Sequence, residues 1–153
     1  MIFVDPGLGG TGWASFPIPG GAPNCFGVLR GGKGPWETQA HDICQGFIGV
    51  LNALRPKAVV MEFPTLWSGD MKSFTSASRG DLFKLSYLIG GLAEAAWECC
   101  PQHPKLITPQ EWKGQLPKEV VIKRILREWP DLEKIPNHAA DAVGMGLAAQ
   151  GKL

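Results

Sequence analysis

Hydrophobic residues change their spacing along the chain, and each spacing predicts a different kind of element. Near the start, short apolar runs are separated by glycine- and proline-rich stretches, which is typical of strands joined by turns. Further on, apolar residues recur every three or four positions from residue 36 to residue 54 and predict an amphipathic helix that ends before Pro56. The predicted strands in this first part of the chain are 2–4, 13–16 and 25–29.

The second part of the chain alternates between strand and helix patterns. Residues 64–79 have no clear period and predict a long loop, a length that favours a functional role. The order of elements predicts one α/β domain over residues 1–153, with a mixed sheet, an antiparallel edge and helices on both faces. The predicted elements are a buried strand at 58–63, a helix at 81–100, a strand at 105–107, a helix starting at 108–109, and helices at 118–129 and 137–150.

Composition adds few constraints on function. The net charge of +1 does not indicate a nucleic-acid binder, so a phosphate-bearing partner would have to meet a local basic patch. The sequence has no apolar run long enough to span a membrane and does not open with a secretory signal, which favours the cytoplasm. The four cysteines lack zinc-binding spacing, and we expect them to be buried thiols in a reducing compartment. They are Cys25, Cys44, Cys99 and Cys100.

Charged residues occur at the ends of otherwise apolar elements. Asp5 ends the first strand, and Glu62 lies near the end of the strand at 58–63. If these strands are parallel, both carboxylates emerge at the same sheet edge, where open α/β sheets place their sites. His138 and Asp141 are three residues apart on the last helix and therefore share one face of it. A charge in such surroundings needs a partner or a cation.

Three carboxylates and an imidazole would suit Mg²⁺ or Mn²⁺, and two such ions can promote phosphodiester hydrolysis. Each residue also has an ordinary explanation when it is taken alone. Asp5 fits a turn, Glu62 a solvent-facing strand end, His138 a position beside a helix N-cap, and Asp141 a salt bridge to lysine or arginine. The metal-site interpretation depends on all four occurring together.

Three motifs resemble those of the RuvC family of Holliday-junction resolvases. The segment VDPGLGGTGW at 4–13 looks like the family's first motif, and VVMEF at 59–63 resembles its second acidic motif. The segment HAADAVGMGLA at 138–148 is similar to the last motif, in which an acidic residue or histidine precedes an aspartate by three positions. Their order and spacing match over nearly the whole chain, and the short length is consistent with a phage or compact bacterial member.

The resemblance implies a fold, an activity and a set of site residues. It implies an RNase H-like mixed five-stranded sheet flanked by helices on both faces, and a homodimer. Dimerisation would use the helix from Gly80 onward, although the apolar residues of this helix are explained equally well as core. It also implies paired nicking of four-way DNA junctions with two Mg²⁺ or Mn²⁺ ions per site. Because some members have aspartate at the third position, His138 is expected to shift the metal preference toward Mn²⁺. The metal-binding positions carried over are Asp5, Glu62, His138 and Asp141.

Substrate-binding residues are expected in two places. The loop at 64–79 offers an aromatic residue that would stack on an unpaired junction base, Trp67 first and Phe74 second, although either would also serve to pack the loop. Lys118 starts a helix, where backbone N–H groups also favour phosphate, and it would assist at the scissile phosphate. Lys118 belongs to a basic cluster that also contains Lys113, Lys123, Arg124 and Arg127, and a plain solvated helix face explains this cluster almost as well. The DNA-binding candidates are Trp67, Lys72, Phe74, Arg79, Lys113, Lys118, Lys123 and Arg124.

Other functions fit parts of this pattern. A nuclease with the same site would cut other branched DNA or RNA, because metal ligands do not recognise the shape of the substrate. A DNA-binding module without activity would not need the complete set of four metal-site residues. An actin-like ATPase also places aspartate and glycines after its first strand, but it needs a second similar domain, for which 153 residues leave no room.

Overall fold

Two parallel strands, β1 (Ile2–Asp5) and β4 (Val59–Glu62), lie side by side inside a five-stranded sheet. The computed structural model describes residues 1–18, 20–64 and 80–153. The strand order is β3-β2-β1-β4-β5; β2 (Thr11–Ser15) and β3 (Cys25–Leu29) form the antiparallel side, and β5 (Lys105–Ile107) pairs in parallel with β4. The predicted mixed α/β sheet with an antiparallel edge is therefore confirmed.

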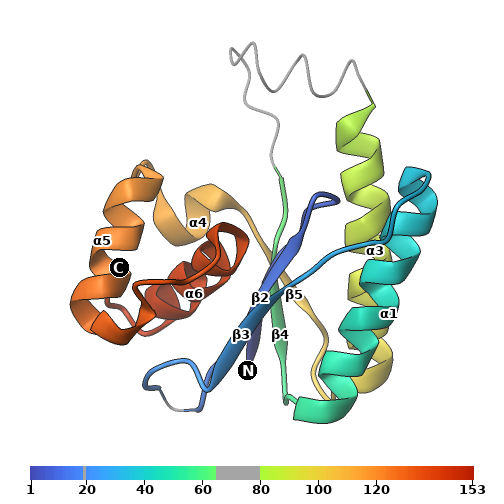
Figure 1. Ribbon diagram of the computed structural model, residues 1–153. Coiled ribbons are helices and arrows are strands. Elements are labelled where there is room, and N and C mark those ends of the chain that lie inside the picture. The colour runs from blue at the N-terminus through green and yellow to red at the C-terminus, as the bar shows by residue number, and fades with distance from the viewer. Residues whose placement is uncertain (19, 65–79) are drawn as a thin grey trace.

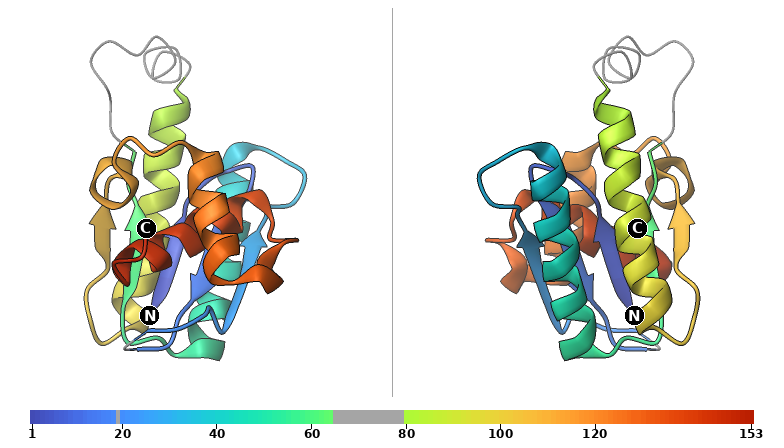
Figure 2. Two further views of the ribbon diagram at one scale, coloured as in Figure 1. Left: turned by 90° about the vertical axis from the view of Figure 1, so that its left-hand side faces the viewer. Right: turned by 90° about the vertical axis from the view of Figure 1, so that its right-hand side faces the viewer.

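Helices cover both faces of this sheet (Figure 1). Helices α1 and α3 lie side by side on one face, and α4, α5 and α6 lie on the other, as the two side views show (Figure 2). The helices are α1 (Trp36–Leu54), α3 (Asp81–Cys99), α4 (Pro109–Lys113), α5 (Lys118–Glu128) and α6 (Asn137–Ala149), with a short 3₁₀ turn at Pro130–Leu132. Within these described helices, none is long and apolar enough to cross a membrane.

The alternation of side chains along β1 and β4 divides the core into two layers. Ile2 and Val4 face α1 and α3, and Phe3 packs with α5 and α6 on the other face. Val59 and Met61 repeat the first pattern on β4, and Val60, the residue between them, faces α6. Because side chains in a strand alternate between the two faces, the residues that follow Phe3 and Val60 by two positions belong to the α6 face. Those residues are Asp5 and Glu62.

A glycine on β2 allows α6 to approach the sheet at backbone distance. Gly12 pairs with Asp5 in the β1–β2 ladder, and a Cβ atom built on Gly12 would lie 2.0 Å from the carbonyl oxygen of His138. Only a residue without a side chain leaves room for the α6 backbone here. The glycine-rich motif therefore places the first turn of α6 next to the end of β1.

Some predictions of the sequence analysis were imprecise or wrong. β2 begins at Thr11, two residues earlier than predicted, because the Thr11 side chain is buried and its hydroxyl donates to the carbonyl of Gly7 at 3.1 Å. The four cysteines are free, as expected, but each is partly exposed, so the expectation of buried thiols was wrong. They lie at the margins of the layers, where Cys44, Cys99 and Cys100 only border the core.

Candidate active site

Three carboxylates approach one another on the α6 face of the sheet. Asp5 and Glu62 come from the ends of the adjacent parallel strands, and Asp141 comes from the second turn of α6. The side chain of Asp5 is 15% exposed and that of Asp141 is 14% exposed. Burial raises the pKa of Asp5 to about 8, and repulsion from Asp141 and Glu62 contributes to this rise. The ionisation of Asp5 therefore depends on the two other carboxylates, as expected for side chains that share one site.

Lysine side chains balance part of this negative charge. Lys118, the first residue of α5, donates from Nζ to Oδ2 of Asp141 and to the carbonyl oxygen of Asn137, the latter at 3.4 Å. The charges of Lys118 and Lys113 both favour the ionised form of Asp5, although burial and the carboxylates outweigh them. Lys118 thus lies at the predicted place, and Asp141 also has the salt-bridge partner of its ordinary explanation.

Glu62 has a neutral partner. The indole N–H of Trp112, on α4, donates to Oε2 of Glu62 at 2.7 Å. Burial raises the pKa of Glu62, whereas this hydrogen bond and the charge of Lys113 oppose the rise. The ordinary explanation of Glu62 as a solvent-facing strand end does not hold. Trp112 was not among the predicted site residues. The signal that could have pointed to it is that a buried tryptophan needs a hydrogen-bond acceptor for its indole N–H.

His138 lies between the end of β1 and the solvent. Its Nδ1 atom is 3.7 Å from Oδ2 of Asp5, and its side chain is 40% exposed. The prediction that α6 starts at Asn137 or His138 is confirmed, because the helix begins at Asn137 after Pro136. His138 therefore lies beside Asp5 with part of its side chain open to solvent.

The four predicted metal-binding residues lie in one region, but they do not form a closed coordination shell. Among the described residues, no group of three or more histidine, cysteine, aspartate or glutamate side chains has the spacing of a metal site. Lys118 holds Asp141, and Trp112 holds Glu62. The assignment of these residues as metal ligands consequently stays a prediction.

The candidate DNA-binding residues fall into three groups. Lys118 and Lys113 lie near the carboxylates, and Nζ of Lys113 is 4.8 Å from the centre of the Trp112 ring. Lys123 is exposed and Arg124 is half-buried, further along α5. The remaining four candidates fall outside the described residues, so their predicted role is not tested. They are Trp67, Lys72, Phe74 and Arg79.

Comparison of structures finds proteins with a similar fold, whereas comparison of sequences finds no match. No family model matches the chain, and no curated protein matches it. A structure of RuvC from Thermus thermophilus in complex with a Holliday junction substrate matches with a TM-score of 0.74 and 21% identity, over 97% of this chain and 91% of that chain. Another structure of Thermus thermophilus RuvC matches with a TM-score of 0.69 and 22% identity, over 97% of this chain and 92% of that chain. The chain therefore has the RNase H-like α/β fold of RuvC.

Proposed function

We propose that this chain is a member of the RuvC family, a metal-dependent endonuclease that resolves four-way DNA junctions by paired nicks. The observation that carries the proposal is the approach of Asp5, Glu62 and Asp141 from three separate elements, with Lys118 and Lys113 beside them. The RuvC structure that shares this fold holds a Holliday junction. A DNA substrate of this kind agrees with action in the cytoplasm.

The chemistry of the donor set fits a hard divalent cation. Carboxylate oxygens are the ligands that Mg²⁺ and Mn²⁺ prefer. Burial first, and repulsion from Asp141 and Glu62 second, raise the pKa of Asp5, and a bound cation would oppose both effects by favouring the ionised carboxylate. We propose that Asp5, Glu62, His138 and Asp141 hold two such ions. When bound, the ions would supply an activated water and stabilise the leaving oxygen of a phosphodiester.

The other groups of the site would act on the substrate and on the carboxylates. Lys118 lies at the N-terminus of α5, where its ammonium group and the backbone N–H groups both favour a phosphate. When a phosphate and cations enter, Lys118 would exchange its contact with Asp141 for one with the scissile phosphate. Lys113, Lys123 and Arg124 would neutralise backbone phosphates further along the strand.

A homodimer would bring two such sites to one junction. The outer face of α3 carries Phe83, Tyr87 and Trp97, which are 74%, 62% and 55% exposed, whereas its inner face is buried in the core. Together with Gly90 and Glu94, these residues recur along α3 at intervals of four, three, four and three positions. Residues at this spacing form the seam between two helices that pack against each other.

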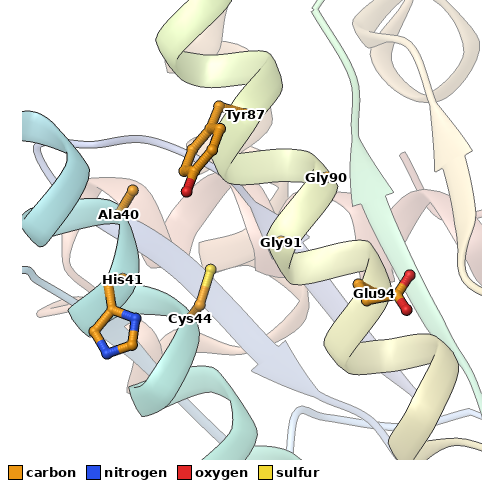
Figure 3. A pocket seen from close by; sticks show the side chains of 7 residues that line it. All are labelled: Ala40, His41, Cys44, Tyr87, Gly90, Gly91 and Glu94. Carbon is orange, nitrogen blue, oxygen red and sulfur yellow. The ribbon is translucent and has the colours of Figure 1, made fainter.

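A hollow beside this seam strengthens the case for a second copy. A cavity of about 410 Å³ lies between α1 and α3, with Tyr87 and Glu94 on one wall and His41 and Cys44 on the other (Figure 3). Large exposed aromatic residues next to a cavity are typical of interfaces. The Phe83→Glu and Tyr87→Glu variants should be monomeric by light scattering, and Leu106→Lys, at an exposed apolar residue of β5, should leave the mass unchanged.

The decisive experiment compares three labelled DNA substrates. A four-way junction, a flap and a plain duplex are incubated with the protein and either Mg²⁺ or Mn²⁺. We expect symmetric nicks in the junction alone. Equal cutting of all three would favour a general nuclease.

Two matched variants separate cleavage from binding. Asp141→Asn should lose cleavage and keep junction binding, and Asp131→Asn, at an exposed carboxylate of the 3₁₀ turn, should keep both. Unchanged cleavage by Asp141→Asn would contradict the proposed site. Junction binding by the wild-type protein without cleavage under either metal would instead support a binding module.

A further inference from the structure

We propose that Trp112 is a positioning residue, whose indole N–H holds one oxygen of Glu62 and turns the other toward the cation and substrate. The inference builds on the proposed function, because it assigns the residue that orients one of its carboxylates. It starts from the 2.7 Å hydrogen bond between Nε1 of Trp112 and Oε2 of Glu62. A carboxylate side chain that ends a strand rotates freely unless a neighbour fixes it, and a metal site needs its ligands fixed.

Contacts at the N-terminal end of α4, which precedes Trp112 in the chain, hold this short helix in place. α4 has five residues, too few for a stable isolated helix. A reciprocal capping box compensates, since Oγ1 of Thr108 accepts from the backbone N–H of Glu111 at 3.3 Å and a carboxylate oxygen of Glu111 accepts from that of Thr108 at 2.6 Å. Pro109 follows as the first helical residue, where its ring geometry suits a helix start. The turn thus presents Trp112 in one orientation.

Packing fixes the ring itself. Trp112 is 8% exposed and lies in the core layer between the sheet and α6. A Cβ atom built on Gly144 of α6 would lie 3.0 Å from Cζ3 of the indole and 2.8 Å from Cγ1 of Val121, so the missing side chain makes room for the ring. The ring therefore links β4, which carries Glu62, to α6, which carries Asp141.

The chemistry of indole suits this role better than that of a lysine. The indole N–H is a neutral donor that cannot accept a hydrogen bond, so it orients a carboxylate and leaves its charge available for a cation. Asp141, by contrast, has a cationic partner in Lys118. Lys113 lies close to the same indole, with its Nζ 4.8 Å from the ring centre, and so stays near Glu62 without a direct bond to it. Glu62 is thus held in place by a neutral donor, whereas Asp141 is held by an ion pair.

A purely structural role for Trp112 would give the same burial, so the test must remove the donor and keep the shape. Trp112→benzothienylalanine replaces the indole N–H with sulfur in a ring of nearly the same size, and Trp112→Phe is a simpler second variant. Trp129 is the matched control because its ring packs in the same layer, 5.7 Å from the ring of Phe16. The same benzothienylalanine replacement at Trp129 should leave every readout unchanged.

Three measurements are made on each protein. Calorimetry should show Mn²⁺ binding weakened about tenfold by loss of the Trp112 donor, a magnitude typical of residues that orient metal ligands. Junction cleavage should lose 10- to 100-fold in kcat with KM for the junction within threefold, because DNA contacts do not change. The ¹⁵N–¹H resonance of the Trp112 indole, assigned by its absence in Trp112→Phe, should move and exchange faster in Glu62→Ala.

The outcomes separate this inference from the proposed function. Unchanged Mn²⁺ binding and kcat in Trp112→benzothienylalanine would overturn the positioning role, and so would a loss caused only by unfolding in both Trp112 variants. Wild-type protein that binds Mn²⁺ without cutting any branched DNA would overturn the proposed function, and the effect of the donor on Mn²⁺ binding would then decide the role of Trp112. Wild-type protein that binds neither Mn²⁺ nor Mg²⁺ would overturn both.

Discussion

Replacing Asp5 with asparagine tests whether its surroundings oppose ionisation. Burial is the largest cause that moves the pKa of Asp5 from 3.8, its ordinary value, to about 8. In the metal-free folded protein, Asp5 therefore keeps its proton at pH values where the unfolded chain has lost it. Between these two pKa values the folded state binds more protons than the unfolded state, so the free energy of unfolding falls as the pH rises.

The magnitude follows from the width of this pH window. One carboxyl group contributes at most about 1.4 kcal/mol for each pH unit between the two pKa values. Because the Asp5 side chain is still 15% exposed and water can reach it, we expect about half of this limit, or roughly 2 kcal/mol lost between pH 5 and pH 8. Asp5→Asn has no titrating group, so it should be the more stable protein at pH 8. A smaller slope of the same sign should persist, because the pKa of Glu62 is also raised.

The assay is urea unfolding in the presence of EDTA at pH 5, 6, 7 and 8, followed by tryptophan fluorescence. Asp131→Asn, at an exposed carboxylate, serves as the control and should keep the wild-type slope. Added Mg²⁺ should stabilise the wild-type protein more at pH 8 than at pH 5, since metal binding requires the ionised carboxylate. A wild-type free energy of unfolding that stays constant or rises with pH would refute the reasoning, as would a full wild-type slope in Asp5→Asn.

Three further predictions concern other parts of the site. Gly12→Ala should lose about 2–4 kcal/mol of stability in denaturant unfolding and most of the cleavage activity, because its Cβ would meet the α6 backbone at 2.0 Å. The control Gly9→Ala has open space around it and should behave as wild type. Equal stability of the two variants would contradict the close approach of α6. Lys118→Met should lower junction cleavage at least 100-fold, because the scissile phosphate loses its ammonium group. It should also lower the free energy of unfolding by about 1–2 kcal/mol, because Asp141 loses its lysine partner. A wild-type kcat in this variant would exclude a role of Lys118 at the phosphate. His138→Asp should raise the ratio of Mg²⁺- to Mn²⁺-supported cleavage, and an unchanged ratio would show that His138 does not set the metal preference.

Sequence patterns predicted most of the fold because its elements are bounded by strong signals. Pro56 follows α1, Pro117 precedes α5, and Thr108 with Pro109 marks the start of α4. The parallel pairing of β1 and β4 also follows from the order of elements. Two antiparallel pairs bring β3 back to the direction of β1, and the helical connection through α1 then returns the chain to β4 in that same direction. Residues 65–79 lie outside the described part of the chain, so the predicted long loop is not tested beyond its first residue.

The site was only partly predictable, for a physical reason. Strand alternation places Asp5 on the same face as Phe3, and Glu62 on the same face as Val60, so sequence alone can put both carboxylates opposite α6. The partners of these carboxylates depend on tertiary packing. The contact of Trp112 with Glu62 joins residues 50 positions apart and exists only because α4 turns back over β4.

The approach of α6 to Gly12 has a consequence for how the protein is made. Asp5 and Glu62 leave the ribosome early, whereas Asp141 lies on a helix synthesised after all five strands. Because the first turn of α6 meets the sheet through the Gly12 backbone, Asp141 reaches the other carboxylates only when this helix docks. A nascent chain without α6 would therefore lack the complete group of carboxylates, and if the proposed function is right, cleavage activity would first appear when this helix docks.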